Sequence, residues 1–265
     1  MNSKIACIGT GAMGGAIFRA VCKKFNPSNI TVSNRTEEKG LAFAKETGCS
    51  FAKTNAAAVA GAKYVFLAVK PVGLGEVLDE ISGALEKDSV VISMAAGVKL
   101  EKISGKLSNG KAVRIMPNVP AQIGQAMTAL CQTEKVSCEE SAEIIEILEA
   151  CGKVEVVKEG LMDCVTAVSG SSPAFVFMFI EAMADAAVRC GMPRNQAYVF
   201  AAQTVKGSAD LVLSTGKHPG ALKDSVTSPG GTTIEGVATL EKDGFRNAVI
   251  DAITAACNKS ISMGK

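Results

Sequence analysis

The stretch that most constrains the fold is IACIGTGAMGGA, residues 5–16. Four residues with the pattern of a buried strand lead directly into Gly9-x-Gly11-x-x-Gly14, and a helical pattern follows at once. In this context Gly9 allows a tight turn, Gly11 lets a pyrophosphate approach the backbone, and Gly14 permits close packing of the helix. The arrangement therefore predicts a dinucleotide bound by the amides that open the helix, rather than a glycine-rich turn alone.

Short apolar strands alternate with helical stretches over the first 159 residues, a spacing typical of a parallel sheet with helices on both faces. Beyond about residue 160, β-branched runs become rare and long helical patterns dominate. We predict an α/β fold with a Rossmann-type parallel-sheet domain at 1–159, followed by an all-helical C-terminal dimerisation domain at 160–265. The expected strands are 5–8, 30–33, 64–69, 89–93, 112–115, 128–131 and 153–157, and the expected helices include 13–24, 37–46 and one from a Ser137–Glu140 capping box to Ala150.

The helical pattern that starts at Phe175 is apolar on every side. Met178 and Ala182 continue one face, while Val176 and Ile180 make the opposite face apolar too. A helix of this kind is buried all round, which a domain of about 100 residues does not easily achieve alone. We therefore expect this helix to lie in a homo-oligomer interface.

Charge and hydropathy exclude several classes of protein. The formal net charge is +2, with 28 basic and 26 acidic residues mixed along the chain, so neither nucleic acid nor a membrane surface is an expected partner. The longest apolar run, 173–180, is much shorter than the roughly 20 residues of a membrane helix. The N-terminus lacks the apolar stretch and cleavage site of a signal peptide, so we expect a soluble, cytoplasmic protein.

The cysteines do not have the spacing of a metal site. None of the nine forms a C-x-x-C pair, several lie in apolar segments, and His218 is the single histidine. We expect reduced cytosolic thiols that act as small core residues, and no metal.

The segment SNRT, residues 33–36, follows the second expected strand and indicates which dinucleotide is bound. A carboxylate about 20 residues beyond the fingerprint would favour NAD, and this segment has none. Arg35 instead offers a charge-assisted contact to the 2′-phosphate of NADP, and Ser33, Asn34 and Thr36 add neutral donors. NADPH is therefore the expected cofactor, with NADH weaker. Capping of the next helix by Asn34 and Thr36 is compatible with this role.

Three other polar residues follow expected strands, at the edge where ligands bind in such sheets. Lys70 lies in LAVKP, residues 67–71, and is expected either against the cofactor or in solvent, without a role in proton transfer. Asn55 and Asn118 occupy comparable positions.

Few side chains are available to donate a proton to a carbonyl substrate. His218 lies in a turn before a proline, which favours a surface histidine. Tyr64 begins a strand away from the cofactor edge, and Tyr198 lies within a helical pattern. This scarcity favours an imine substrate, because a protonated imine accepts hydride without a positioned acid.

Two loops are candidates for holding the substrate, SGSSPAF at 169–175 and TSPGGTT at 227–233. Each places hydroxyls and glycines before a helix, with Ser172 or Ser228 as the expected N-cap and proline at the first helical position. For the first loop, a well-capped helix is an equally good explanation. The second also exposes glycine amides beside threonine hydroxyls, an anion nest that suits a small carboxylate.

The motifs GTGAMG, AVKP, RIMPNVPA and SGSSPAFVFMFIEAMADAA resemble those of the pyrroline-5-carboxylate reductases, and the similarity runs essentially end to end. The most specific stretch is HPGALKDSVTSPGGTTIEGVATLEKDGF, residues 218–245. The resemblance implies an oxidoreductase of proline biosynthesis that reduces the cyclic imine 1-pyrroline-5-carboxylate to L-proline with a nicotinamide cofactor. It also implies a helical domain that interlocks in homodimers, often assembled into larger rings.

The resemblance further implies site residues, which we assign at the matching positions. Thr233 is the expected catalytic residue, close to the ring nitrogen. The expected substrate-binding residues are Ser172, Val226, Ser228, Gly230, Gly231, Thr232 and Thr233. The expected cofactor-binding residues are Gly9, Thr10, Gly11, Ala12, Met13, Gly14, Asn34, Arg35, Thr36, Asn55, Ala68, Val69, Lys70, Pro71, Ala95, Ala96, Gly97 and Asn118.

Two other functions fit parts of the sequence. A β-hydroxyacid dehydrogenase shares a G-x-G-x-M-G opening but uses a lysine on an interdomain helix, and no lysine lies between Lys158 and Lys206. A non-catalytic NADP sensor would need no second ligand site, whereas the loop at 227–233 provides the chemistry of one.

Overall fold

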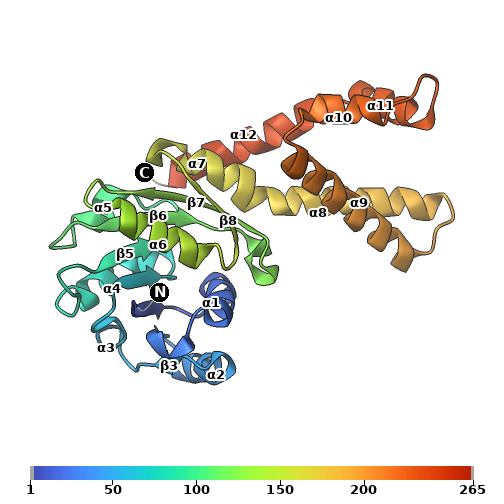
Figure 1. The fold of residues 1–265 in the computed structure, drawn as a ribbon. Helices are drawn as coiled ribbons and strands as arrows, with labels where there is room; N and C mark the ends of the chain where they lie inside the picture. Colours follow the sequence, from blue (N-terminus) through green and yellow to red (C-terminus); the bar gives the residue numbers. More distant parts are fainter. Residues whose placement is uncertain (1–2, 264–265) are drawn as a thin grey trace. The chain divides into compact units, whose positions relative to one another are not determined.

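A computed structural model describes residues 3–263, which form two compact units (Figure 1). The first, here called the sheet unit, comprises residues 3–170 together with 256–263. The second, the helical unit, comprises Ser171–Ala255.

The sheet unit is built on one eight-stranded sheet with the strand order β3-β2-β1-β4-β5-β6-β7-β8. Neighbouring strands are parallel except β6 and β7, which are antiparallel. Each strand expected from the sequence is present, whereas the two-residue β3 was not expected. The strands are β1 (Ile5–Ile8), β2 (Ile30–Ser33), β3 (Ser50–Phe51), β4 (Tyr64–Leu67), β5 (Val90–Ser93), β6 (Ala112–Met116), β7 (Ala126–Gln132) and β8 (Gly152–Val156).

Helices cover both faces of the sheet because its strands are apolar on both sides (Figure 1). In β4, Tyr64 and Phe66 belong to one core layer, while Val65 and Leu67 belong to the other. Phe18 on α1 packs edge-on against Phe66, with ring centroids 5.2 Å apart. The first layer holds α1 (Ala12–Lys24), α2 (Glu37–Thr47) and α6 (Cys138–Leu148), and the second holds α3 (Asn55–Val59), α4 (Leu74–Ile81) and α5 (Leu100–Ser104). The expected capping box opens α6.

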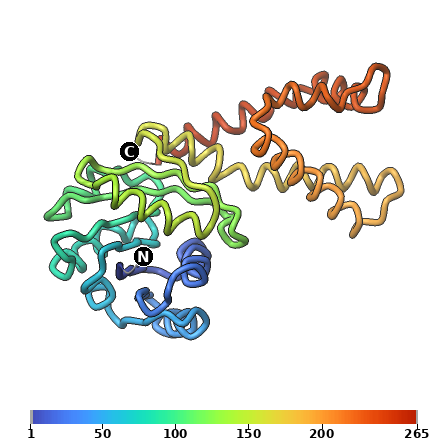
Figure 2. Tube along the Cα trace, in the orientation of Figure 1, coloured from blue at the N-terminus to red at the C-terminus, as the bar shows by residue number. Residues whose placement is uncertain are grey.

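After β8 the chain leaves the sheet through η4 (Glu159–Leu161), α7 (Met162–Val165) and a π-helix, η5 (Thr166–Ser171). The end of the chain returns to this region, where Ser260 on α12 (Phe245–Met263) donates a hydrogen bond of 2.6 Å to Asp163. Figure 2 shows this last segment beside α7. The division between the units, at residues 170 and 171, lies beyond the expected domain boundary at 159 and 160, and Met162 and Ala167 are buried in the sheet unit.

The helical unit has very little core of its own. It consists of α8 (Ser172–Arg189), α9 (Arg194–Thr215), α10 (Pro219–Ser225), α11 (Thr232–Lys242) and the first part of α12. Within it, the buried hydrophobic residues that the structure describes are three alanines, Ala184, Ala197 and Ala201, between α8 and α9. Phe177 is 59% exposed and Met178 is 67% exposed. The apolar surface expected on this helix is therefore present and uncovered within one chain.

One helical stretch, 159–189, is long and apolar enough to cross a membrane by length and composition alone. The longest unbroken apolar run, 173–180, is much shorter than this stretch, because Glu181 and Asp185 interrupt the run. Only 6% of its most apolar part is buried inside the structure. Most of its exposed large hydrophobic residues lie on α8 (Val176, Phe177, Met178 and Phe179), and Leu161 and Val168 precede that helix.

The nine cysteines are free thiols, but not all are core residues as expected. Cys138, Cys164 and Cys190 are exposed. The core contains Cys7, Cys22, Cys49, Cys131 and Cys151. Residues 3–263 contain no group of three potential ligands that would hold a metal ion.

Candidate active site

The fingerprint loop between β1 and α1 has the geometry predicted for its three glycines. Gly9 has a φ of +100°, and a Cβ there would lie 2.5 Å from the carbonyl oxygen of Ala68. A Cβ at Gly14 would clash with the Gly9 carbonyl and with Ala68 Cβ. Gly11 has no other group within 4 Å of its Cβ position. The tight turn, the close packing and the open approach are therefore confirmed.

The open side of this loop fits an anionic group such as the diphosphate of a dinucleotide. Gly11 is the exposed N-cap of α1, whose first amides have no partner within the helix, and no acidic residue lies in its first turn. The hydroxyl of Thr10, in the same loop, is buried without a hydrogen-bond partner among the described residues. An anion at this position would meet amide donors and no opposing carboxylate.

Asn34 ties the end of β2 to the fingerprint loop. Its Oδ1 accepts a hydrogen bond of 3.1 Å from Thr10 N, and its Nδ2 donates one of 2.9 Å to Thr36 O. Thr36 is the N-cap residue of α2, but no side chain caps that helix. Thr36 therefore occupies the expected N-cap position without a side-chain bond, whereas the expected cap by Asn34 is wrong because its amide is already engaged across the loop.

Arg35 is left available to a ligand by this arrangement. Its side chain is exposed, and the ion pairs found within residues 3–263 do not include it. The sequence position one residue after Asn34 places Arg35 next to the fingerprint loop, where a phosphate on the adenosine ribose would lie in a Rossmann-type site.

Asn55, the first residue of α3, is held between two side chains. Its Oδ1 accepts a hydrogen bond of 2.7 Å from Ser33 Oγ, and its Nδ2 donates one of 2.7 Å to Glu80. Ser33 is the last residue of β2, so this chain of hydrogen bonds orders the polar groups beside SNRT. Glu80 was not predicted, because it lies on α4 and nothing in the local sequence links it to Asn55.

The other predicted cofactor residues also follow strands at one edge of the sheet. Strands β1, β2, β4, β5 and β6 are parallel, so their carboxyl ends share that edge, and the strand order reverses between β1 and β4. This reversal is where open α/β sheets bind ligands. Lys70 and Pro71 are exposed after β4, at the start of η2 (Pro71–Gly73). After β5, Gly97 has a φ of +75° and Ala95 is buried.

Asn118 differs from these residues because its amide is turned into the protein. It is 8% exposed, accepts a hydrogen bond of 2.9 Å from Met127 N, and donates one of 3.0 Å to Ser169 O. It therefore links the end of β6 both to β7 and to the π-helix η5.

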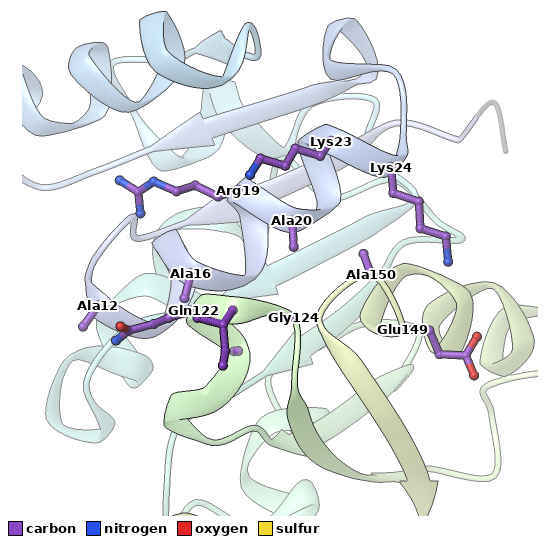
Figure 3. A pocket seen from close by; sticks show the side chains of 12 residues that line it. Ala12, Ala16, Arg19, Ala20, Lys23, Lys24, Gln122, Gly124, Glu149 and Ala150 are labelled. Carbon is purple, nitrogen blue, oxygen red and sulfur yellow. The ribbon is translucent and has the colours of Figure 1, made fainter. Parts of the chain in front are cut away.

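A cavity of about 840 Å³ lies on the flank of α1 (Figure 3). Ala12, Ala16 and Ala20 line it from α1, together with residues of η3 (Val119–Ile123) and the segment after α6. It shares only Ala12 with the predicted cofactor residues. The predicted cofactor residues therefore lie at the carboxyl edge of the sheet and, apart from Ala12, outside this cavity.

In the helical unit, the loop 227–233 forms a turn against the start of α11. The helix begins at Thr232 with Gly231 as its N-cap, so the expected N-cap at Ser228 is wrong. Gly230 has a φ of +65°, and Gly231 N donates a hydrogen bond of 3.1 Å to Ser228 O. A Cβ at Gly231 would clash with Ser228 Oγ. The turn thus brings the Ser228 hydroxyl to the end of α11 at which Thr233 is exposed.

The loop 169–175 is already helical, which overturns the expected cap at Ser172. Ser172 is the first residue of α8, which continues directly from η5, and the preceding Ser171 has helical dihedral angles and no side-chain cap. Pro173 does lie in the first turn, as expected.

The scarce proton donors have structural roles. His218 Nδ1 accepts a hydrogen bond of 3.0 Å from Gly220 N and so caps α10. Tyr64 is fully buried at the amino end of β4, and burial followed by its hydrogen bond to Glu143 raises the pKa of its hydroxyl. Tyr198 stacks under the guanidinium of Arg194, 5.5 Å from the ring centroid.

Comparison with known proteins identifies the family. Residues 159–263 match a family model for pyrroline-5-carboxylate reductase dimerisation, and residues 4–97 match one for coenzyme F420-dependent NADP oxidoreductase. The pyrroline-5-carboxylate reductase of Escherichia coli K12 is 47% identical, with both chains covered completely. The chain belongs to the pyrroline-5-carboxylate reductase family.

Solved structures agree over the full length. A pyrroline-5-carboxylate reductase from Coxiella burnetii has a TM-score of 0.94 at 33% identity, with both chains covered completely. The pyrroline carboxylate reductase of Plasmodium falciparum, solved with NADP bound, has a TM-score of 0.87 at 31% identity and covers 100% of this chain and 99% of its own.

This reductase is therefore an NAD(P)-dependent oxidoreductase of proline biosynthesis with a Rossmann-type sheet domain and a helical dimerisation domain. The dimerisation match includes all of α8, so the uncovered apolar helix belongs to a homo-oligomer, as expected. The alternatives of a β-hydroxyacid dehydrogenase and of a non-catalytic sensor are both rejected.

Proposed function

We propose that the reductase converts 1-pyrroline-5-carboxylate to L-proline with NADPH, the last step of proline biosynthesis. The observation that carries this proposal is the open fingerprint loop, with Arg35 free next to it, in a full-length member of the family. In this proposal residues 1–159 bind the cofactor, while residues 160–265 bind the imine carboxylate and form the oligomer.

The cofactor-binding residues in this proposal follow the carboxyl ends of five neighbouring strands. The α1 amides beyond Gly11 bind the diphosphate, and NADPH supplies the hydride once bound. Asn34 keeps the β2 end against the fingerprint through its bond to Thr10 N. The set is Gly9–Gly14, Asn34–Thr36, Asn55, Ala68–Pro71 and Ala95–Gly97; Asn118, which the sequence also suggested, is left out because its amide is engaged with Met127 N and Ser169 O.

The substrate carboxylate binds at the N-terminal end of α11 in this proposal. That end offers helix amides without partners, and the Ser228 hydroxyl lies beside it. Thr233, in the first turn, is the catalytic residue and contacts the ring nitrogen. Ser172, Val226, Gly230, Gly231 and Thr232 complete the substrate-binding set.

No general acid is required in this reaction. The substrate binds as an iminium whose proton comes from water, and its ring carbon then accepts the hydride while the nitrogen becomes the amine of proline. The protein contributes binding and orientation. This explains why His218 and Tyr64 are free to serve as a cap and as a core residue.

We also propose that the oligomer is a homodimer or a larger ring of dimers, and that the reductase is cytoplasmic. The exposed apolar side chains of α8 and α9 support the first proposal, and the free thiols support the second.

The test is turnover of 1-pyrroline-5-carboxylate with NADPH and with NADH, for the wild type and for Arg35→Ala. We expect the wild type to favour NADPH. Loss of Arg35 should weaken NADPH binding about ten- to a hundredfold and leave NADH nearly unchanged, because a charge-assisted bond to the 2′-phosphate is lost. Lys45→Ala, which removes an exposed charge from the last turn of α2, the helix that follows Arg35, is the control.

The outcomes separate the parts of the proposal. Equal losses for NADPH and NADH would overturn the role of Arg35 in recognising the 2′-phosphate. Turnover that favours NADH would keep the imine chemistry and reject the cofactor assignment. Absence of turnover with either cofactor, in protein that binds NADPH, would reject the substrate.

A further inference from the structure

The backbone of the π-helix contains a carbonyl that the helix itself cannot satisfy in α geometry. In an α-helix, the carbonyl of residue 169 would accept from the N–H of residue 173. Residue 173 is proline and has no N–H. The Ser169 carbonyl, immediately before α8, therefore lacks its α-helical donor at the point where the chain leaves the sheet unit.

Asn118 supplies that donor from a different part of the fold. Its Nδ2 donates to Ser169 O over 3.0 Å, and its Oδ1 is fixed by Met127 N over 2.9 Å. Because the side chain is only 8% exposed, water does not readily replace either bond. The amide thus has a fixed orientation and holds one defined backbone atom.

A second contact between the same two segments supports this anchor. A Cβ added at Gly170 would lie 3.1 Å from Met116 Cε, at the end of β6, so the π-helix passes close to the strand that leads into Asn118. Within η5, the Thr166 and Ser169 hydroxyls donate to the carbonyls of Met162 and Val165, four residues earlier. Such π-helical turns frequently occur at functional sites.

We propose that Asn118 is a positioning residue that anchors the π-helix and thereby sets the substrate-binding segment that begins at Ser172, rather than a direct contact of the cofactor. This inference rests on the proposed function, in which Ser172 binds the substrate. It revises the role of Asn118 from holding the dinucleotide to fixing the Ser169 carbonyl. The position of Asn118 after β6, among the cofactor loops, had suggested the former role.

The test uses Asn118→Asp in the full-length reductase. The aspartate keeps an acceptor for Met127 N but does not donate to Ser169 O when ionised. We expect the KM for 1-pyrroline-5-carboxylate to rise about tenfold, while the dissociation constant of NADPH changes less than twofold. Amide hydrogen exchange should become faster over residues 166–175 and stay unchanged in β1, β4 and β5.

Three further substitutions, Asn109→Ala, Pro173→Ala and Asn118→Ala, distinguish anchoring from a general loss of stability. Asn109 makes the same kind of bridge at the amino end of β6, where it donates to the carbonyls of Lys87 and Ser89 and accepts from Lys111 N. Asn109→Ala should lower stability without raising the KM for the imine. Pro173→Ala restores an N–H at residue 173, so Asn118→Ala should be less harmful in that background than in the wild type.

Each outcome decides one claim. An NADPH dissociation constant that rises as much as the imine KM would show a direct cofactor contact and overturn the proposal. Unchanged hydrogen exchange over 166–175 would overturn it as well. A wild type without imine turnover would instead reject the proposed function, and the exchange experiment and the Pro173→Ala comparison of unfolding free energies would still decide the anchor.

Discussion

At the scale of single residues, Thr233 has the exposure and position that a substrate contact needs. It lies in the first turn of α11, after a turn that requires glycine at residues 230 and 231, and its side chain is exposed. We expect Thr233→Ala to lower kcat/KM for the imine about ten- to a hundredfold, because one hydrogen bond to a charged ring is lost. NADPH binding, measured by fluorescence titration, should change less than twofold.

The control for this substitution lies on the same helix. Thr239 is also exposed on α11, and its hydroxyl donates to the Glu235 carbonyl within the helix. Thr239→Ala should leave kcat/KM within about twofold, since only a local bond is lost. Equal effects of the two substitutions would show that helix stability, and not substrate contact, accounts for the result.

The roles of some site residues could be predicted from the sequence, and those of others could not. The roles of Gly9, Gly11 and Gly14 follow from spacing, because a strand–turn–helix of this length leaves little choice of backbone. The bond from Asn118 to Ser169 joins residues 51 positions apart and depends on tertiary packing. The sequence contains only part of the information needed to predict this bond. Pro173, four residues after Ser169, leaves the Ser169 carbonyl without its α-helical donor.

At the scale of elements, α6 is held to the sheet by Glu143. Its carboxylate accepts hydrogen bonds from Tyr64 Oη over 2.8 Å and from Lys63 Nζ over 3.2 Å. Burial acts to raise the pKa of Glu143, but the hydrogen bonds from Tyr64 and Lys63 prevail and hold the pKa below its ordinary value. A carboxyl group with a lowered pKa stabilises the fold above its unfolded pKa of about 4.3, and this stabilisation is lost as the pH falls through the folded pKa.

We therefore expect Glu143→Gln to lower the free energy of unfolding at pH 7 by about 1 kcal/mol, the scale of a partly exposed charged contact. The difference from the wild type should shrink as the pH is lowered below about 4, where the wild-type carboxyl is protonated. Urea unfolding at both pH values measures this. Glu146→Gln, at an exposed position on the same helix, should have little effect at either pH. If the difference in unfolding free energy between the wild type and Glu143→Gln were the same at both pH values, the stabilisation would not depend on the ionisation of Glu143.

Element prediction succeeded where the apolar pattern was strong and failed where turns decided the outcome. The buried strands and α1, α2 and α6 follow from periodicity, within a few residues at each end. The start of α11 was placed too early, because Ser-Pro usually opens a helix whereas the left-handed Gly230 delays it here. The π-helix has no periodicity that distinguishes it from an α-helix in sequence, so the cap expected at Ser172 was wrong.

At the scale of the whole molecule, the helical unit is too poor in core to be stable without a partner. Three alanines are its buried hydrophobic residues within the described part of the chain, while Phe177, Met178 and Phe200 remain exposed by 59%, 67% and 62%. The match to the dimerisation model covers all of these positions. Folding of this unit and association of the subunits should therefore be one process, with an unfolding midpoint that rises with protein concentration.

We expect Phe177→Glu to separate the subunits, because it places a charge in an apolar interface and removes a large aromatic side chain. At micromolar concentration, sedimentation velocity should show mainly monomer, and the helical signal of circular dichroism should fall. Leu41→Glu, at a position 49% exposed on α2 of the sheet unit, should remain oligomeric. If Phe177→Glu kept the wild-type sedimentation coefficient and the same concentration dependence of unfolding, α8 would have to be covered on a face other than the one carrying Phe177.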